Sequence, residues 1–372
     1  MAEIKNIKKA AKRIKKAVKD KEKVILYGDA DMDGISSVII LKEAIKNLGG
    51  QVSAVYFPNR EIEGYGLNED ALDYLKDQAP ALLIVLDCGI GNIEEVKLAK
   101  KMGFEVMIVD HHEPLKKLPS ASIIVNPKQK GDKYSLKEFA ASGVVFRLAE
   151  ALLKKKLSVS LRNNFLELTA LATLADMMPH IKDNVEFIRE GMASLKSTFR
   201  PGLKVFTEGP QKIISACHAG SNENHINECY LLLTSTSVKK AERLAKELQE
   251  KAYARRMRIR EIVSQIEKMI SKKPENIIVF EGDRAWPVLM LGPAASKICQ
   301  SFKKPVFLYS QKREYCQGAT RTPKGIDGVK AMIHCSKTLE SYGGHPQAAG
   351  FRTQKESLEE FKACLIKYFK NL

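Results

Sequence analysis

The sequence has no long hydrophobic run. None of its apolar stretches approaches the roughly 18 to 20 residues that a membrane-spanning helix needs, so we expect no membrane partner. The N-terminal segment MAEIKNIKKAAKRIKKAVKD has neither an apolar core nor a cleavage site, and it therefore does not read as a secretory signal. Internal repeats and low-complexity segments are also missing, which argues against a solenoid or a disordered chain.

Cysteine is sparse and scattered. The chain has 7 cysteines among 372 residues, and none of them forms a C-x-x-C pair. An odd number at irregular spacing argues against a disulfide framework and against a zinc ribbon. The pattern favours a reducing, cytoplasmic environment.

Acidic residues are outnumbered by basic ones. The chain has 61 Lys and Arg against 44 Asp and Glu, giving a formal net charge of +17. Such an excess favours a polyanionic partner such as nucleic acid, while a Lys-rich surface selected for solubility is the alternative. Residues 3–20 predict a helix with one apolar side and one basic side. We favour a solvated surface for that basic side over a nucleic-acid face.

The hydrophobic pattern predicts an α/β fold. Short, unbroken apolar segments alternate with amphipathic helices, which is typical of a parallel sheet covered on both faces. The predicted strands are 23–27, 51–57, 81–86, 105–109 and 121–125, and the helices between them are 35–48, 68–77 and 93–102. Residues 140–200 predict further helices. We expect a catalytic domain over 1–236, a long connecting helix over 237–272 and a smaller α/β domain over 273–372, with strands at 276–280 and 305–309 and a last helix at 356–369.

Acidic motifs follow three of the predicted strands directly. YGDADMDG contains Asp29, Asp31 and Asp33; LDCGIGN contains Asp87; and VDHHEP contains Asp110, His111 and His112. Ligand sites in parallel sheets form beyond the carboxyl ends of the strands, so the three motifs should meet at one edge. Any one of these aspartates alone would most often be a helix cap. A calcium loop is a poor alternative for D-x-D-x-D-G because no Glu completes the loop.

The predicted chemistry is a metal centre. Clustered carboxylates repel one another, and a bound cation removes that cost. Histidine among the ligands shifts the preference toward Mn²⁺, with Mg²⁺ as the alternative. A pair of such ions can hold both the attacking water and the leaving oxygen of a phosphodiester.

The ordered set of motifs resembles the DHH phosphoesterase superfamily, and specifically its RecJ-like exonuclease branch. VDHHEP is the motif that names the superfamily. YGDADMDGISS, LDCGI and LATLADMMPH are similar to further family motifs, and FPNREIEGYGL (57–67) also resembles RecJ proteins. GATRTPKGID (318–327) and GGHPQAAGF (343–351) resemble the family's DHH-associated, substrate-binding domain. The resemblance extends from about residue 23 to about residue 352.

The resemblance implies roles for the matching residues. The implied ligands are Asp29, Asp31 and Asp87 for one ion, and Asp33, Asp87, His111 and Asp176 for the other. The implied catalytic residues are Asp110, His111 and His112, with Asp110 orienting the histidines and His112 contacting the scissile phosphate or acting as a general acid. The implied substrate ligands are Arg321, Gly343, Gly344 and His345.

This chain departs from the family pattern in three ways. Asp29 stands where many relatives have a histidine. The segment 212–225, KIISACHAGSNENH, occupies the position of a segment that carries Asn and Arg in relatives, and His218 lies near the expected Arg. That segment often contacts the strand end, so the polarity of digestion cannot be inferred. We also expect this chain to lack the additional oligonucleotide-binding barrel of longer bacterial relatives.

Three functions remain open from the sequence. The leading hypothesis is a two-metal exonuclease on single-stranded DNA, and on RNA as well, in DNA repair or replication. The alternative is a phosphodiesterase or phosphatase for short oligonucleotides or cyclic dinucleotides, which would not need a strongly basic surface. The third is a non-catalytic replication or repair scaffold, which the retained carboxylates and histidines disfavour. A replication or repair protein is a conceivable partner, and the oligomeric state is open.

Overall fold

The computed structural model describes residues 3–272 and 275–372, in two compact units. The first unit comprises Met1–Ala252 and the second Tyr253–Leu372, so their division falls inside the long helix α11 (Val238–Ile270). The helix expected over 237–272 therefore contributes residues to both units. Residue 273, where we expected the second domain to begin, lies outside the described residues.

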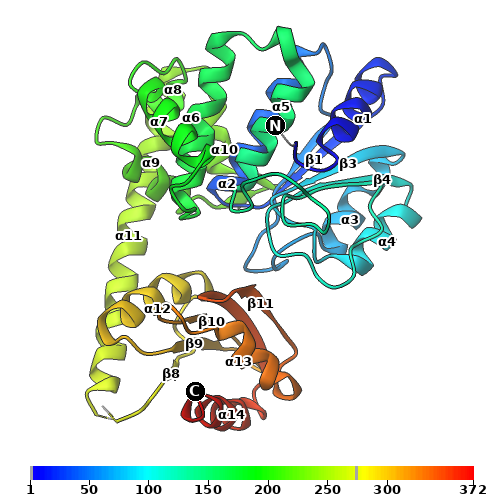
Figure 1. The fold of residues 1–372 in the computed structure, drawn as a ribbon. Coiled ribbons are helices and arrows are strands. Elements are labelled where there is room, and N and C mark those ends of the chain that lie inside the picture. The colour runs from blue at the N-terminus through cyan, green and yellow to red at the C-terminus, as the bar shows by residue number, and fades with distance from the viewer. Residues whose placement is uncertain (1–2, 273–274) are drawn as a thin grey trace. The chain divides into compact units, whose positions relative to one another are not determined.

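The first unit contains the predicted parallel sheet. Its strand order is β2-β1-β3-β4-β5, and every neighbouring pair is parallel. The strands are β1 (Val24–Gly28), β2 (Ala54–Tyr56), β3 (Ala81–Leu86), β4 (Phe104–Val109) and β5 (Ile123–Val125). All residues of β1 and β3 are buried, as expected for central strands with both faces covered (Figure 1).

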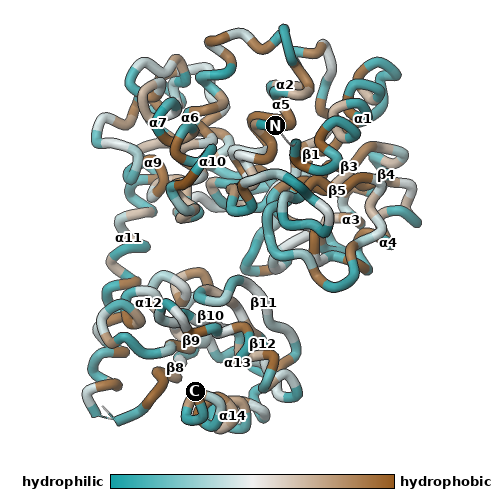
Figure 2. The backbone as a smooth tube through the Cα atoms, viewed as in Figure 1, coloured by the Kyte–Doolittle hydropathy of each residue, from teal (hydrophilic) through white to brown (hydrophobic). Residues whose placement is uncertain are grey.

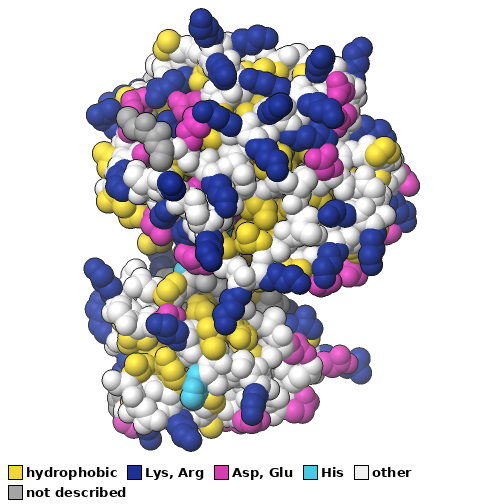
Figure 3. Space-filling model, turned by 45° about the vertical axis from the view of Figure 1, so that its right-hand side comes forward, with side chains coloured by type: hydrophobic (Ala, Val, Ile, Leu, Met, Phe, Trp, Pro, Cys, Tyr) yellow, Lys and Arg dark blue, Asp and Glu magenta, His cyan; other side chains and the backbone are white. Residues whose placement is uncertain are grey.

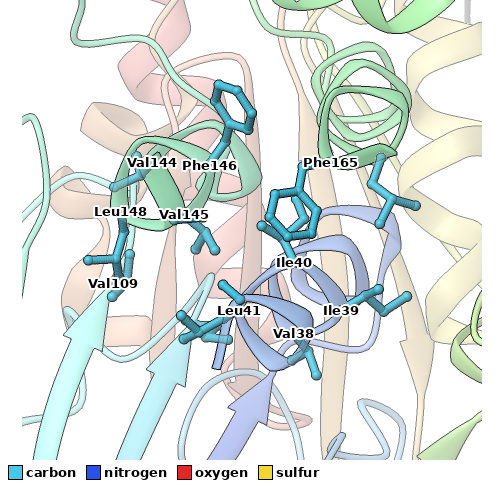
Figure 4. Close-up of a cluster of buried hydrophobic side chains, with 14 of the residues drawn as sticks. Val38, Ile39, Ile40, Leu41, Val109, Val144, Val145, Phe146, Leu148 and Phe165 are labelled. Carbon is cyan, nitrogen blue, oxygen red and sulfur yellow. The ribbon is translucent and has the colours of Figure 1, made fainter. Parts of the chain in front are cut away.

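Helices cover the two faces of this sheet separately. Alternate residues of β1 divide between two hydrophobic clusters, with Leu26 in one and Ile25 in the other. The first cluster includes residues of α1 (Ile7–Lys19), α2 (Met32–Asn47), α5 (Ala141–Leu153) and α6 (Val159–Ala175), and the second includes residues of α3 (Glu69–Leu75) and α4 (Ile93–Lys101). Figure 4 shows the contact of α2, α5 and α6 through side chains such as Ile40, Val145 and Phe165, and Figure 2 shows the hydrophobic strands.

Further helices of the first unit follow α6 and precede α11 in the sequence. They are α7 (Asp183–Leu195), α8 (Pro201–Lys204), α9 (Pro210–Cys217) and α10 (Glu228–Leu233), with the short hairpin β6 (Asn222–Glu223) and β7 (Ile226–Asn227) before α10. The packing of α7 on α6 requires a glycine: a Cβ on Gly191 would lie 2.2 Å from the carbonyl oxygen of Leu166.

The N-terminal helix α1 is amphipathic as predicted. Ile7 and Ile14 are buried, whereas Lys8, Lys9 and Lys12 are exposed. Its basic face is smaller than expected, since Arg13 forms ion pairs with Glu22 and Glu105 at 2.5 and 2.7 Å. Figure 3 shows Lys and Arg side chains spread over the face of the molecule that it draws.

The second unit is a mixed sheet with helices. Its strand order is β11-β12-β10-β9-β8; only β8 and β9 are parallel. The strands are β8 (Val279–Gly282), β9 (Val306–Gln311), β10 (Tyr315–Arg321), β11 (Ser341–His345) and β12 (Ala348–Gln354), and the helices are α12 (Val288–Phe302), α13 (Gly328–His334) and α14 (Leu358–Lys370). β8, β9 and α14 lie where the sequence predicted two strands and a helix, whereas β10, β11 and β12 were not predicted. Gly343 and Gly344 lie in strand β11 rather than in a turn.

The cysteines differ from expectation. Cys217 is joined to Cys229, and Cys335 to Cys364, in disulfide bonds, so the argument against disulfides was wrong. Sequence spacing gave no signal because the fold brings α9 beside α10 and α13 beside α14. Cys88, Cys299 and Cys316 are buried thiols.

No helix among residues 3–272 and 275–372 combines the length and apolar character needed to cross a bilayer.

Candidate metal centre

The ends of three adjacent strands bring the acidic motifs together. Gly28 pairs with Leu86, and Leu86 pairs with Val109, so the next residue of each strand emerges at the same edge. The backbone N–H of Asp29 donates to Leu86 at 3.2 Å, and that of Asp87 donates to Val109 at 3.0 Å. The expected meeting of the motifs at one edge of the sheet is therefore observed.

The first motif continues into the start of α2. Asp31 is the N-cap, and its Oδ1 accepts hydrogen bonds from the backbone N–H groups of Asp33 and Gly34 at 2.9 and 3.1 Å. Asp33 lies in the first turn and is 3% exposed. Its carboxylate accepts from the backbone N–H groups of Ala141 and Ser142 at 2.6 and 2.8 Å, at the start of α5. Two helix N-termini thus hold this part of the site.

His111 lies among carboxylates from three separate segments. Its Nε2 is 3.2 Å from Asp87 Oδ1, 3.7 Å from Asp176 Oδ2 and 3.9 Å from Asp33 Oδ2. Asp176 is the residue that ends α6. Asp176 was expected in the site only because of the resemblance, and the structure places it beside His111.

The donor set fits divalent cations. Asp87 Oδ1 and Asp176 Oδ2 are buried and have no hydrogen-bond partner. Asp33, His111 and Asp176 present ligand atoms within 4.8 Å of one another, as do Asp29, Asp31 and Asp87. Buried oxygen atoms without donors are costly unless a cation compensates them, and carboxylates with imidazole suit Mn²⁺.

The raised pKa values of the carboxylates also indicate that a cation compensates their charge. Burial raises the pKa of Asp87 well above its usual value, and the charge of Asp33 raises it further. Burial and Asp31 raise the pKa of Asp33 to about 6, and burial and Asp33 raise the pKa of Asp176 to about 8. A bound cation favours the ionised forms and so removes this cost.

Asp110 and His112 form a separate pair beside the centre. Asp110 Oδ1 accepts from His112 Nδ1 at 2.8 Å and from the backbone N–H of His111 at 2.7 Å, while its Oδ2 accepts from Ile90 N–H at 3.0 Å. Burial lowers the pKa of His112, but the charge and the hydrogen bond of Asp110, together with the charges of Asp176 and Asp29, raise it to about 9. Oδ1 of Asp110 thus orients the histidine segment, while Oδ2 ties Asp110 to the loop after β3.

Arg60 is a member of the site that the sequence analysis did not single out. Its guanidinium lies on Asp29 and Asp31, and its Nη2 donates to Asp31 Oδ2 at 2.8 Å. Tyr65 accompanies it, with the ring centroid 5.8 Å from the guanidinium carbon and the hydroxyl 3.2 Å from the Asp87 carbonyl oxygen. Both residues belong to FPNREIEGYGL, which had been noted only as a family-like segment.

Two family models match the chain in order. The model described as the DHH family, N-terminal domain matches residues 23–173, and the DHHA1 domain matches residues 274–371. The chain belongs to the DHH family. The resemblance identified from the motifs is therefore confirmed.

Proteins similar to this DHH-family chain include RecJ exonucleases. It is 32% identical over 380 residues to the single-stranded-DNA-specific exonuclease RecJ of Bacillus subtilis, covering 98% of this chain and 48% of the relative. A solved structure of exonuclease RecJ bound to manganese is similar at TM-score 0.80 and 27% identity, covering 100% of this chain and 96% of that one. RecJ of Thermus thermophilus in complex with Mn²⁺ is similar at TM-score 0.85 and 25% identity, covering 99% of this chain and 55% of that one.

The chain spans about half the length of the RecJ proteins of Bacillus subtilis and Thermus thermophilus. The structural matches agree with the α/β fold class of a parallel-sheet DHH domain and a smaller DHHA1 domain.

The DHHA1 domain aligns two of the expected substrate ligands. Arg321 in β10 and His345 in β11 both pair with Ala348 of β12, so they lie in one row across three strands. The Arg321 side chain is held by Ser296 Oγ at 3.1 Å and by the Thr320 carbonyl at 2.8 Å, neither of which is an acid. A guanidinium held by neutral oxygens keeps its charge available for an anion.

Proposed function

We propose that this DHH-family chain is a metal-dependent exonuclease that hydrolyses phosphodiester bonds of single-stranded DNA, and of RNA as well, in DNA repair or replication. The observation that carries the proposal is the position of Asp87. This buried residue contributes to one acidic group with Asp29 and Asp31, and it lies beside His111 of the other. A carboxylate between two ion sites is the arrangement that a two-metal phosphodiesterase requires.

The proposed ions are Mn²⁺, with Mg²⁺ as the alternative. Asp31 and Asp87 would hold one ion, and Asp33, Asp87, His111 and Asp176 the other; Asp29 was expected with the first group. When bound, the ions would supply an activated water and charge neutralisation for the reacting phosphate. Among the chain's own residues, Asp110 orients the His112 ring through a hydrogen bond. His112, whose pKa is raised, is placed to donate a proton or to contact the phosphate.

The proposed substrate follows from the relatives and the charge. Similar RecJ proteins are named as specific for single-stranded DNA. The net charge of +17 provides for phosphate contacts along a strand. We propose residues 1–236 as the catalytic domain, 237–272 as the connecting helix and 273–372 as the substrate-binding domain, in which Arg321, Gly343, Gly344 and His345 bind the strand. The proposal places the chain in the cytoplasm, with a replication or repair protein as a candidate partner.

Digestion of labelled strands tests this function. Single-stranded DNA and RNA, each labelled at either end, are incubated with the chain and Mn²⁺, and duplex DNA serves as the control. We expect progressive shortening of the single strands, and none with Asp87→Asn. Cleavage confined to substrates of a few nucleotides would instead assign the chain to oligonucleotide or cyclic-dinucleotide hydrolysis. No cleavage of any substrate would overturn the enzymatic proposal.

A further inference from the structure

Four basic side chains gather at one end of the sheet in the second unit. β8 and β9 are parallel and both end at this edge of the sheet, where β10 begins and β12 ends (Figure 1). The segments at these strand ends line a pocket of about 340 Å³, which falls in the range of roughly 300 to 1,000 Å³ typical of ligand-binding clefts. The residues that line it, which we call the basic pocket, are Arg284, Gln311, Lys312, Arg313 and Lys355.

Backbone hydrogen bonds fix the segments that carry these side chains. The N–H of Lys312 donates to the Tyr315 carbonyl oxygen at 2.8 Å and closes the turn between β9 and β10. The N–H of Lys355 donates to the Glu314 carbonyl oxygen at 3.1 Å, so the end of β12 is tied to the same turn. The basic side chains therefore start from backbone positions that the sheet holds together.

The basic pocket has no acid of its own to balance its charge. Four of its five lining residues are cations and none is an acid. In the described part of the chain, the side chains of these four residues form no hydrogen bond or ion pair. Asp283, next to Arg284, accepts from the Ala285 N–H at 2.7 Å, and the neighbouring acids Glu314 and Glu356 are exposed. Like charges repel, so this arrangement favours an anionic ligand.

The chemistry of the lining residues favours phosphate groups. The guanidinium forks of Arg284 and Arg313 match two oxygens of one phosphate, and the two lysines add point charges. All five lining residues are polar, whereas a protein interface usually has an apolar or aromatic centre. Binding to the phosphates of nucleic acid needs no such centre, because it is mainly electrostatic.

We propose that the basic pocket binds phosphates of the single strand several nucleotides away from its reacting end. β10 runs from the pocket at Tyr315 to the proposed substrate ligand Arg321, which is 7 residues, or about 20 Å at roughly 3.3 Å per residue. Successive phosphates lie about 3.4 Å or more apart along a strand, so about six nucleotides or fewer cover this distance. The inference rests on the proposed nuclease function and adds a second strand-binding site to it.

Binding in EDTA tests the pocket without cleavage. The anisotropy of a labelled single strand of about 20 nucleotides, long enough to reach both sites, is measured over a range of salt concentrations. The pocket variant is Lys312→Gln with Lys355→Gln. The matched control is Lys337→Gln with Lys367→Gln, two exposed lysines of the same unit, so both variants have the same net charge.

The pocket variant and its control should differ in affinity and in salt dependence. We expect the pocket variant to weaken binding about tenfold and to lower the salt slope by about 1.4, or about 0.7 for each lost phosphate contact. The control should stay within about twofold of the wild type, because it removes charge without removing a contact. Equal changes in the two variants would overturn the proposal.

A second pair of substitutions guards against a local folding defect. Arg284→Gln with Arg313→Gln removes the two guanidinium groups and should weaken strand binding at least as much as the lysine pair does. Because the four side chains form no hydrogen bond or ion pair in the part of the chain that the structure describes, we expect both pocket variants to keep the Tm of the wild type. Unchanged strand binding by the folded arginine variant would contradict the proposal.

Other anions distinguish the strand from a free phosphate and from an acidic protein. Inorganic phosphate and polyglutamate are titrated by calorimetry into the wild type and into the lysine variant of the pocket. Loss of phosphate binding in that variant, with strand binding unchanged, would assign the pocket to free phosphate. Loss of polyglutamate binding alone would assign it to an acidic protein. Either result would overturn the proposal.

Cleavage kinetics separate failure of the pocket from failure of the proposed function. With Mn²⁺, we expect Lys312→Gln with Lys355→Gln to raise KM about tenfold for a strand of about 20 nucleotides and much less for a dinucleotide, which is too short to reach the pocket. Cleavage by the wild type with equal KM in the pocket and control variants would overturn the pocket alone. Pocket-dependent binding in EDTA, with no cleavage of any substrate, would overturn the proposed function and leave the pocket assigned.

Discussion

The Nε2 atom of His111 lies 3.2 Å from Oδ1 of Asp87, an oxygen that has no hydrogen-bond donor. This contact joins the ends of β3 and β4, which are neighbours in the sheet. We expect His111→Ala and Asp87→Asn each to weaken Mn²⁺ binding and to lower the proposed exonuclease activity at least about a hundredfold, because each removes a proposed ligand of the centre. Calorimetry with Mn²⁺ and the end-label assay measure the two effects.

The matched control for His111 is His180, an exposed histidine in the segment that follows α6. His180→Ala should keep both metal binding and activity. Full Mn²⁺-dependent activity in His111→Ala would show that the centre is wrongly assigned.

The stability of the metal-free protein should fall as pH rises. The folded-state pKa values of Asp33 and Asp176 are raised, to about 6 and about 8, from a usual value of 3.8, and the cause is first burial and then neighbouring charge. The folded state therefore holds more protons than the unfolded state between about pH 4 and about pH 8, and the free energy of unfolding decreases across that range. Asp31 and Asp110 have lowered pKa values, so their protonation changes the free energy of unfolding only below that pH range.

Thermal unfolding in EDTA from pH 5 to pH 8.5 measures this dependence. We expect a falling Tm in EDTA and a flatter curve with saturating Mn²⁺, since the cation stabilises the ionised carboxylates. Asp176→Asn should reduce the slope in EDTA because the amide does not titrate. A Tm that rose with pH in EDTA would contradict the raised pKa values.

Much of the first unit could be predicted because its signals are local. β3 is a continuous apolar segment, and its observed bounds are those expected. The helix expected over 68–77 is found as α3, and its N-cap Asn68 accepts from Ala71 N–H at 2.8 Å. The acidic motifs could be placed at one edge because the order of parallel strands constrains where their ends lie. Asp176 could not be derived this way, because it depends on how α6 packs against α2.

The second unit was harder for a physical reason. β11 contains Ser341, Gly343 and Gly344 and is mostly exposed, so it has neither the apolar alternation nor the β-branched residues that indicate strands. Arg60 was missed for a related reason. It lies in a loop without periodicity, and its partners are 29 and 31 residues away in sequence.

Gly343 and Gly344 should respond differently to alanine. A Cβ on Gly343 meets nothing within 4 Å, whereas Gly344 has a φ of +132°, and a Cβ there would lie 2.6 Å from the Ala348 carbonyl oxygen. We expect Gly343→Ala to keep its Tm and Gly344→Ala to lose stability, since a side chain is strained at that φ. Binding of single-stranded DNA, measured by fluorescence anisotropy, should nevertheless weaken in Gly343→Ala if the exposed backbone there contacts the strand. Unchanged binding in a stable Gly343→Ala would remove Gly343 from the substrate site.

Asn222 should control the segment that carries Arg60. Its amide bonds two successive carbonyl oxygens, those of Phe57 and Pro58, and its Oδ1 accepts from Asn227 at 2.7 Å. Asn222→Ala leaves these groups without their partner, which costs about 1–3 kcal/mol of stability. Because Arg60 follows Pro58 closely, we also expect KM for single-stranded DNA to rise, while the number of bound Mn²⁺ ions stays unchanged. Denaturant unfolding, steady-state kinetics and calorimetry measure the three quantities.

The comparison for Asn222 is Ser122, whose hydroxyl donates to the Val106 carbonyl oxygen at 2.9 Å between β4 and β5. Ser122→Ala also removes a hydrogen bond to a backbone carbonyl, but its segment carries no residue of the site. We expect it to lower stability and to leave KM unchanged. An equal rise of KM in both variants would mean that general loosening of the sheet, rather than the position of Arg60, governs substrate binding. A rise confined to Asn222→Ala would tie substrate binding to the segment that Asn222 holds.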